Sequence, residues 1–383
     1  MTAITSASGP AAGRATRIST RIAFFIAGFG MAAWAPLVPF AKSRIGIDDG
    51  LLGLLLLCLG AGSLITMPLA GALASRFGCR MVIVLSTILI CLTLPLLASV
   101  SSLPFLVVTL LLFGAGVGAV DVSMNIQAII VERDHGSPIM SGFHGLFSFG
   151  GICGAAGVTA LLALGATPLI AALAVAIGVV ICLAIAARDL LSYGSKSEGP
   201  AFALPRGVVL FIGLLCFVVF LTEGAILDWS AVFLTSVRGL DNAYAGLGYA
   251  AFAATMTIGR LTGDRIVSSL GGTRVIIFGG LLAAAGLLLA VLIPSWQVAL
   301  VGYALVGVGC SNIVPVLFTS VGKQQVMPES VAVPAITTLG YAGILVGPAA
   351  IGFIAHGASL PIAFGIIALL LLGVAASGRL LKV

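Results

Sequence analysis

Three carboxylic acids lie within long apolar stretches of this sequence: Asp121, Glu223 and Asp228. An ionisable side chain at the centre of a membrane span costs about 2.5–3.5 kcal/mol on insertion scales, so such acids usually have a function. Asp121 and Asn125 are four residues apart and therefore share one helix face. Glu223 and Asp228 are five residues apart, about 140° around a helix, so they cannot both face one cavity, and we favour Glu223. These groups suit a hydroxyl-rich ligand or a carried proton, or they make interhelical hydrogen bonds that only hold spans together.

A histidine and two serines follow on one helix face. His144 has Ser141 and Ser148 beside it in a helical register. Histidine can exchange a proton near neutral pH, although a buried histidine can equally serve as a structural hydrogen-bonding group. We therefore keep His144 as a candidate for proton coupling or ligand binding.

Three further residues complete the candidate set. Asn312 is the rough counterpart of Asp121 if the chain is an internal repeat. Trp34 and Trp229 lie near the outer ends of their spans, where tryptophan either stacks on sugars and cations or belongs to an interfacial belt. The candidate residues for substrate binding or proton coupling are thus Asp121, Asn125, His144, Glu223, Asp228, Asn312, Trp34 and Trp229.

Basic residues are missing from the expected centre of the membrane. No Lys or Arg falls near the midplane of a predicted span, and we place Arg260 near the inner end of its span. A site for an organic anion normally supplies a cation. We therefore expect the transported compound to be neutral or cationic.

The elements that must position these residues are membrane spans. The chain has 383 residues, of which 60% are hydrophobic and only 8% are charged, against about 25% charged in soluble domains. Mean hydropathy is +1.26. A water-soluble globular protein and a disordered chain are both excluded, because the first would expose too much apolar surface and the second needs high charge. We predict an all-α polytopic membrane protein.

We predict twelve spans. They lie at residues 20–40, 50–73, 80–99, 104–131, 138–163, 167–187, 207–235, 243–263, 273–293, 297–320, 329–354 and 359–380. Each is long enough to cross about 30 Å of hydrocarbon. Residues 1–16 are expected to be a disordered cytoplasmic tail. Residues 17–187 and 207–383 are expected to form two six-helix bundles, joined by a polar linker at 188–206 that contains two prolines and several charges.

The basic residues orient this topology. With the N-terminus in the cytoplasm, 15 of the 18 Lys and Arg residues lie on the inner side, and only Lys42, Arg44 and Arg238 lie outside. This asymmetry is typical of multi-pass proteins. It predicts that both termini are cytoplasmic and that the protein lies in the cell (inner) membrane.

The two halves echo each other at an offset near 190 residues. The sequence GALASR at 71–76 corresponds to GRLTGDR at 259–265, and GVG occurs at both 116–118 and 307–309. GxxxG pairs occur at Gly150 and Gly154 and again at Gly343 and Gly347. Inverted or parallel repeats of this kind are typical of secondary transporters.

The repeated loop resembles the signature of the major facilitator superfamily, roughly G-x-L-x-D-R-x-G-R-R. The first copy is GALASRFGCR at 71–80, with Ser75 at the usual Asp position, and the second lies at 259–274. The segments DVSMNIQ at 121–127 and SGFHGLFS at 141–148 are similar to bacterial members near the fucose-permease branch. The resemblance implies two pseudo-symmetric six-helix bundles that rock against each other, with spans five and eleven at the contact between the halves. It implies an inner gate formed by Gly71, Arg76, Arg80, Asp264 and Arg265.

These observations predict a secondary active transporter that moves a small neutral polar solute, such as a sugar or polyol, by proton-coupled symport. One alternative is proton-coupled efflux of cationic or lipophilic drugs, because GYAGILVGP at 340–348 resembles an antiporter signature, although in span eleven instead of span five. A second alternative is a transporter-like receptor. We expect no enzyme, ATP-driven engine, cofactor or metal site, since the nucleotide-binding, zinc-protease and CxxC motifs do not occur. The expected partners are the solute, protons and the bilayer, without nucleic acid, and the chain is expected to be a monomer.

Overall fold

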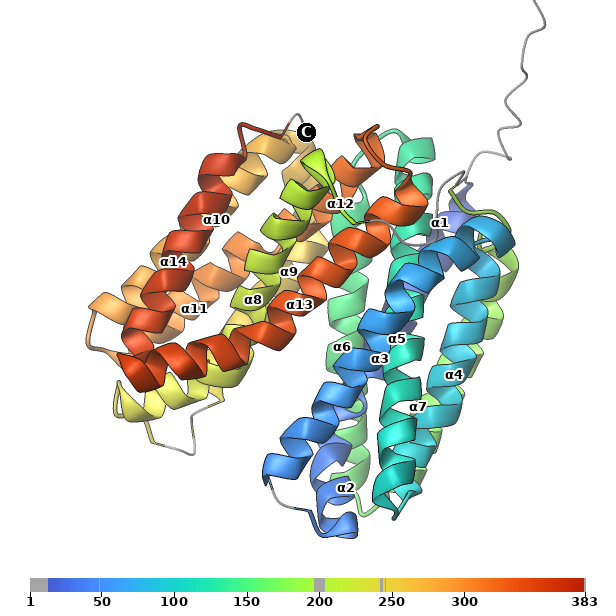
Figure 1. Ribbon diagram of the computed structural model, residues 1–383, viewed down its shortest axis with the longest axis horizontal. Helices are drawn as coiled ribbons and strands as arrows, with labels where there is room; N and C mark the ends of the chain where they lie inside the picture. The colour runs from blue at the N-terminus through green and yellow to red at the C-terminus, as the bar shows by residue number, and fades with distance from the viewer. Residues whose placement is uncertain (1–12, 48, 196–203, 242–243, 245, 382–383) are drawn as a thin grey trace, which may run out of the picture.

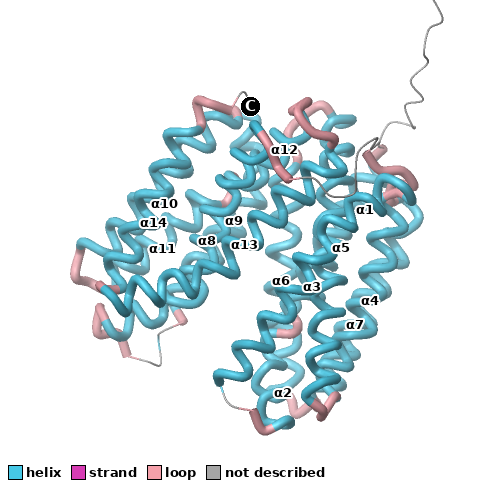
Figure 2. The backbone as a smooth tube through the Cα atoms, in the orientation of Figure 1, coloured by secondary structure: helices cyan, strands magenta, loops and turns pink. Residues whose placement is uncertain are grey.

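The computed structural model describes residues 13–47, 49–195, 204–241, 244 and 246–381. Within these ranges the chain is helical, and loops occur only at the ends of helices (Figure 2). The helices of the first half are α1 (Arg14–Ala32), η1 (Ala35–Leu37), α2 (Val38–Ile45), α3 (Asp49–Phe77), α4 (Cys79–Ser99), α5 (Leu103–His135), α6 (Met140–Ala163), α7 (Pro168–Ala186) and η2 (Ala187–Asp189). Those of the second half are α8 (Gly207–Ser236), α9 (Leu247–Leu270), α10 (Gly272–Leu292), α11 (Trp296–Cys310), α12 (Ile313–Lys323), α13 (Glu329–Gly357) and α14 (Leu360–Ser377).

Each predicted span corresponds to one helix or one broken helix. The described residues contain 11 helical segments long and apolar enough to cross a membrane, counting α1 with α2 and α11 with α12 as continuous segments. The twelfth is α9, which is less apolar because its second half carries Arg260, Asp264 and Arg265. The chain is therefore a multi-pass membrane protein with an all-α fold.

The helices form two bundles that are related to each other in their packing. In the first half α1 packs on α6 and α3 on α5, and in the second half α8 packs on α13 and α9 on α11. The bundles meet near the end of the molecule that carries the C-terminus and the start of α1, and they diverge toward the opposite end (Figure 1). We call these the terminus side and the open side. Contacts between the bundles involve α3 with α13, α6 with α9, and α12 with both α5 and α6.

The GxxxG pairs lie inside the bundles and not between them. A Cβ on Gly150 would lie 2.2 Å from the carbonyl oxygen of Phe25, and one on Gly343 would lie 2.4 Å from the carbonyl oxygen of Phe217. These glycines therefore let α6 approach α1, and α13 approach α8, at backbone distance. Spans five and eleven (α6 and α13) do contact the opposite half, as expected, but through other residues.

Two of the three basic residues on the open side cap helix ends. The guanidinium of Arg44 donates to the carbonyl oxygens of Leu97, Ala98 and Val100, at 2.7, 2.7 and 2.9 Å, where α4 ends. In the second half Arg238 donates to the carbonyls of Ala290 and Val291 at the end of α10, at 2.8 and 2.6 Å. These cations satisfy carbonyls that have no partner within the helix and oppose the negative end of the helix dipole.

The predicted tail and linker differ from the structure in detail. Helix α1 begins at Arg14, so residues 14–16 are helical, and residues 1–12 lie outside the described residues. The linker begins by packing against the first bundle, since its Leu191 accepts a hydrogen bond from the amide of Arg80 at 2.8 Å and Tyr193 accepts one from the amide of Cys79 at 3.3 Å. Residues 196–203 of the linker lie outside the described residues.

Candidate functional site

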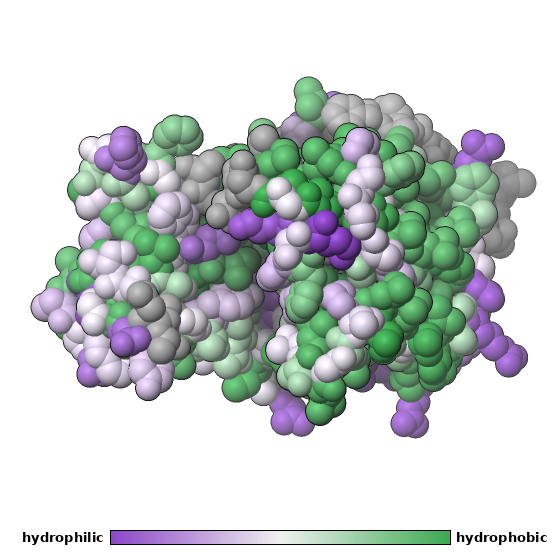
Figure 3. Space-filling view, turned by 90° about the horizontal axis from the view of Figure 1, so that it is seen from below, coloured by the Kyte–Doolittle hydropathy of each residue, from purple (hydrophilic) through white to green (hydrophobic). Residues whose placement is uncertain are grey.

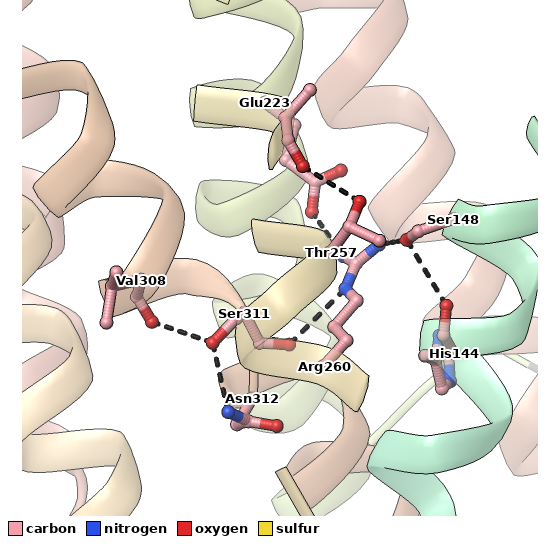
Figure 4. A network of polar contacts seen from close by, with 9 residues as sticks. His144, Ser148, Glu223, Thr257, Arg260, Val308, Ser311 and Asn312 are labelled. Atoms are coloured by element: carbon pink, nitrogen blue, oxygen red, sulfur yellow. Dashed lines mark hydrogen bonds and ion pairs between the residues drawn. The ribbon is translucent and has the colours of Figure 1, made fainter. Parts of the chain in front are cut away.

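Arg260 is the centre of a polar network that joins the two bundles. Its side chain is buried in α9, and each of its three nitrogens has a partner. Nη2 lies 2.9 Å from Oε1 of Glu223 in α8, Nη1 donates to the hydroxyl of Ser148 in α6 at 2.9 Å, and Nε donates to the carbonyl of Ser311 at 3.3 Å. Ser148 belongs to the first bundle and the other residues to the second. Figure 4 shows the guanidinium between these groups.

The position of Arg260 corrects the expectation that the polar core contains no cation. Helix α9 continues to Leu270, ten residues beyond Arg260 and about 15 Å further along the axis, whereas the predicted span ended at residue 263. The arginine therefore lies well inside the helix and is 6% exposed. It pairs with Glu223, so the acid that we favoured over Asp228 is the one that has a buried partner.

His144 lies beside this network and contacts both bundles. Its carbonyl accepts a hydrogen bond from the Ser148 hydroxyl at 3.2 Å. Its ring centroid is 5.3 Å from that of Phe24 in α1 and 5.6 Å from that of Phe318 in α12. The ring is 8% exposed and its Nε2 has no hydrogen-bond partner. His144 thus combines an apolar packing role across the interface with one unused polar atom.

Asp121 and Asn125 form the polar site of the first bundle. Asn125 donates from Nδ2 to the carbonyl of Asp121 at 2.9 Å and to its Oδ1 at 3.2 Å. Oδ1 of Asn125 is buried without a partner. In the described part of the chain no Lys or Arg lies within ion-pair distance of Asp121, and the Tyr341 phenol of α13 is close enough to interact with it electrostatically. Asp121 therefore faces the second bundle as a carboxylate without a cation.

The remaining candidates lie around this centre in different environments. Asp228 is exposed and lies, with Glu223 and Arg260, within electrostatic range of the Tyr249 phenol. Trp229 is half-buried and packs near Gly352 of α13. Trp34 is 5% exposed and its indole nitrogen has no partner, so it is a core residue of the first bundle.

The side-chain amide nitrogen of Asn312 is hydrogen-bonded to neighbouring protein groups. The residue precedes α12, where the span breaks, and donates from Nδ2 to the carbonyl of Gly259 at 3.0 Å and to the hydroxyl of Ser311 at 2.9 Å. Its Oδ1 is buried without a partner. Asn312 therefore links α9 to α12 directly behind Arg260.

The terminus side is closed by carboxylates that bind across the interface. Oδ1 of Asp264 in α9 accepts a hydrogen bond from the amide of Gly142 in α6 at 2.8 Å. Glu132 accepts from the hydroxyl of Thr319 in α12 at 2.5 Å, and Arg133 forms an ion pair with Glu329 of α13. These contacts join α5 and α6 of the first bundle to α9, α12 and α13 of the second.

Of the five residues implied as an inner gate, two make contacts between the bundles. Asp264 does so as described, and a Cβ on Gly71 would lie 2.1 Å from the carbonyl oxygen of Ser330 in α13. Arg76, Arg80 and Arg265 are exposed and form no ion pair in the described part of the chain. Ser75, at the usual Asp position, donates to the carbonyl of Ala72 in its own helix at 2.8 Å. The gate is therefore asymmetric.

The open side has the opposite character. Figure 3 views this face, where strongly hydrophilic side chains gather near the middle, between a mainly hydrophobic surface on the right and a more mixed surface on the left. No contact between the bundles comparable to Asp264–Gly142 is found near the open ends of the described helices. The contacts that join the two bundles through Asp264, Glu132 and Arg133 therefore close the terminus side.

Sequence reasoning missed three residues of this arrangement. Arg260 was placed too close to the membrane surface, Glu132 was assigned no role, and Tyr249 was not considered. The pattern Arg260–Asp264, one turn apart on a helix opposite a mid-span acid, was the signal that could have placed the arginine in the core.

Comparison with known proteins agrees with this architecture. The family model of the Major Facilitator Superfamily matches residues 21–332. An uncharacterised MFS-type transporter of Yersinia pestis is 57% identical over 96% of this chain and 96% of its own length. Membrane protein MosC of Rhizobium meliloti is 34% identical over 88% of this chain and 83% of its own length.

Solved structures share the fold at low sequence identity. The E. coli fucose:proton symporter FucP has a TM-score of 0.79 with 17% identity, covering 96% of this chain and 98% of that one. A structure of FucP in the outward conformation has the same TM-score and coverage with 16% identity. The proton:xylose symporter XylE has a TM-score of 0.73 with 14% identity, covering 95% and 94%. With the family model matching most of its length, the chain belongs to the major facilitator superfamily and is a transporter, not an enzyme.

Proposed function

We propose that this transporter carries a small neutral, hydroxylated solute, of the sugar or polyol class, together with a proton. The observation that carries the proposal is the pair of partly buried acidic sites on opposite bundles: Asp121 with Asn125 in the first, and Glu223 with Arg260 in the second. Amides, carboxylates and guanidinium groups form the directional hydrogen bonds that hydroxyl groups require. Two shared-fold relatives, FucP and XylE, are described as sugar:proton symporters, which supports the same class.

A neutral solute fits the charges better than an anion. Arg260 is the cation nearest the centre, yet all three of its nitrogens already have partners in Glu223, Ser148 and the carbonyl of Ser311. An anionic solute would have to displace Glu223 from the guanidinium. We therefore still propose a neutral solute, but because the guanidinium is already paired and not because a cation is absent, as the sequence had led us to expect.

Protonation provides the coupling. Asp121 has no cation partner among the described residues, so closing the bundles over it while it is charged would bury an uncompensated charge. The charged form is strongly disfavoured in such an environment. Binding of a proton and of a solute that satisfies the remaining polar groups removes this penalty, and the loaded carrier can then open on the terminus side.

The distribution of basic residues predicts which side of the membrane the terminus side faces. If both termini are cytoplasmic in the inner membrane, the terminus side is the inner gate and the structure is outward-facing. The fold similarity to FucP in an outward conformation is consistent with that assignment. Labelling of single cysteines at the exposed residues Ser192 and Ser236 with a membrane-impermeant reagent in intact cells tests it, since only Ser236 should react.

Transport in proteoliposomes tests the function itself. We expect a panel of neutral sugars and polyols to include one that enters with a proton and makes the external medium alkaline. Glu223→Gln and Asp121→Asn should each abolish accumulation against a gradient, and one of them should retain exchange. Asp189→Asn, which removes an exposed carboxylate on the terminus side, is the matched control and should behave as wild type. Solute uptake without any proton movement would reject the coupling.

We favour symport over the efflux alternative, whose sequence support is a glycine-rich stretch of α13. In the stretch 340–348, which resembles an antiporter signature, Gly340 faces the ring of Phe220 and Gly343 the backbone of Phe217. These glycines serve close packing of α13 on α8. The same vesicles with an opposed proton gradient and a cationic dye provide the comparison, and dye extrusion in place of sugar uptake would favour efflux.

A further inference from the structure

A small basic cavity lies on the terminus side, outside the transport site. It has a volume of about 210 Å³ and is lined by Arg14, Arg17, Ile18, Arg21, His135 and Ile139. Its walls come from the first turns of α1, the last residue of α5 and the residue before α6. The volume is below the roughly 300–1,000 Å³ of pockets for drug-sized ligands, so it suits one polar group and not a whole solute.

Three arginines line this cavity, and none of them forms an ion pair among the described residues. Arg14, Arg17 and Arg21 are spaced three and four residues apart, so they lie on one face of α1. The Nη1 atom of Arg17 lies within hydrogen-bond distance of both ring nitrogens of His135, at 2.8 and 3.2 Å. Like charges at this spacing repel each other. An anion in the cavity would offset that repulsion.

The residues around the cavity indicate which class of anion it could bind. Arginine guanidinium groups bind phosphate oxygens with paired hydrogen bonds. The cavity lies at a membrane-facing end of α1, where Ile18 is 43% exposed beside the arginines. Basic clusters next to a span attract anionic lipid headgroups, at about 1 kcal/mol per Lys or Arg.

We propose that this cavity binds the phosphodiester headgroup of an anionic phospholipid. The arginines would hold the phosphate, and Ile18 and Ile139 would contact the beginning of an acyl chain. The headgroup would then tie α1 to the α5–α6 turn, next to Gly142 and Asp264, because Arg21 lies within electrostatic range of Asp264. The site is separate from Arg260 and Asp121 and does not depend on which solute is carried.

Thermal unfolding of the detergent-purified full chain tests the proposal. Short-chain dioctanoyl phosphatidylglycerol should raise the midpoint by several degrees with saturation, whereas dioctanoyl phosphatidylcholine should not. Arg14→Gln/Arg17→Gln/Arg21→Gln should abolish the shift. Arg188→Gln/Arg274→Gln/Arg379→Gln removes the same charge from exposed residues elsewhere and should retain it. If the pocket triple variant does not fold, the single variant Arg14→Gln, whose arginine makes no hydrogen bond among the described residues, should weaken lipid binding at least threefold.

Three outcomes would overturn the proposal. The two lipids share the phosphodiester and differ in net charge, so equal shifts would show that the cavity does not select an anionic headgroup. An equal loss in the control triple variant would show that overall charge, and not this cavity, attracts the lipid. A saturable shift of the same size with glycerol phosphate or inorganic phosphate would assign the cavity to a soluble phosphate compound instead of a lipid.

Discussion

Asp264 accepts a hydrogen bond from the backbone amide of Gly142, at 2.8 Å, so a carboxylate of one bundle caps a helix of the other. The same end of α6 is bound by Glu132 of the first bundle, which accepts from the amides of Ile139 and Met140 at 2.8 and 2.7 Å. The first amides of a helix lack partners within the helix and carry the positive end of its dipole. The closed state of the terminus side therefore uses one helix end as a shared anchor.

Removing the charge of Asp264 should open this side. Asp264→Asn keeps the shape of the side chain but loses the charge–dipole interaction, about 1 kcal/mol, or roughly fivefold in the closed population. Spin labels at Ser192 and Ser269, exposed on the two bundles, should report a longer distance in the variant, in a background without the seven cysteines. Asp189→Asn is the control. An unchanged distance distribution would mean that Asp264 does not hold the gate.

Adding one methyl group at Gly71 should have a larger effect. A Cβ there would lie 2.1 Å from the carbonyl oxygen of Ser330, and a backbone oxygen cannot move aside as a flexible side chain can. Gly71→Ala should therefore separate α3 from α13 and lower the closed population at least tenfold, measured with the same spin labels. Gly157→Ala, also in a helix, meets no atom within 4 Å and should leave the distance unchanged. Equal behaviour of the two variants would contradict this account.

The fold was largely readable from the sequence, and the site only partly. Apolar length predicts a span well, because a bilayer requires about 20 apolar residues and tolerates few charges. It does not show where a helix ends once it leaves the hydrocarbon. Helix α9 continues through charged residues to Leu270, and this extension moved Arg260 from the surface into the core. Glu223 was identified because a mid-span acid is costly, but its partner was hidden by the wrong boundary.

The contacts between the two bundles could not be predicted from the sequence, for a different reason. Glu132, Thr319 and Glu329 lie in polar positions near helix ends, where their residue types alone indicate only a solvated surface. Their roles depend on how two separate bundles dock. Ser75 shows the converse, since its departure from the motif is visible in the sequence, and in the structure its hydroxyl donates to the carbonyl of Ala72 within α3.

The ion pair at the centre should be visible in stability. Arg260→Met leaves the partly buried Glu223 without its cation; breaking a fully buried pair costs about 3–5 kcal/mol, so we expect a loss of about 2 kcal/mol here. Glu223→Gln/Arg260→Met removes both charges and should recover at least half of that loss. The measurement is thermal unfolding in detergent, with Arg265→Met, an exposed arginine five residues further along α9, as the control. Additive losses in the double variant would show that the two charges do not stabilise each other.

The arginine caps on the open side should stabilise each bundle without affecting transport chemistry. Hydrogen bonds from charged groups contribute about 1.5–3 kcal/mol, so Arg44→Gln and Arg238→Gln should each lower stability by about 2 kcal/mol. Arg238→Lys should lower stability more than Arg44→Lys does. The guanidinium of Arg238 also lies 4.9 Å from the centre of the Phe233 ring, and this stacking contact favours the planar guanidinium over an ammonium group.

The two caps lie in different bundles, which makes their combination informative. Sites without shared partners usually add within about 0.5 kcal/mol, so Arg44→Gln/Arg238→Gln should lose the sum of the single effects in thermal unfolding, while the half-saturating solute concentration stays at the wild-type value. Arg274→Gln removes an exposed arginine and should change neither quantity. A raised half-saturating concentration in both cap variants would instead indicate that these arginines contact the solute as it enters, since a cap at the end of α4 or α10 acts on the stability of its own bundle.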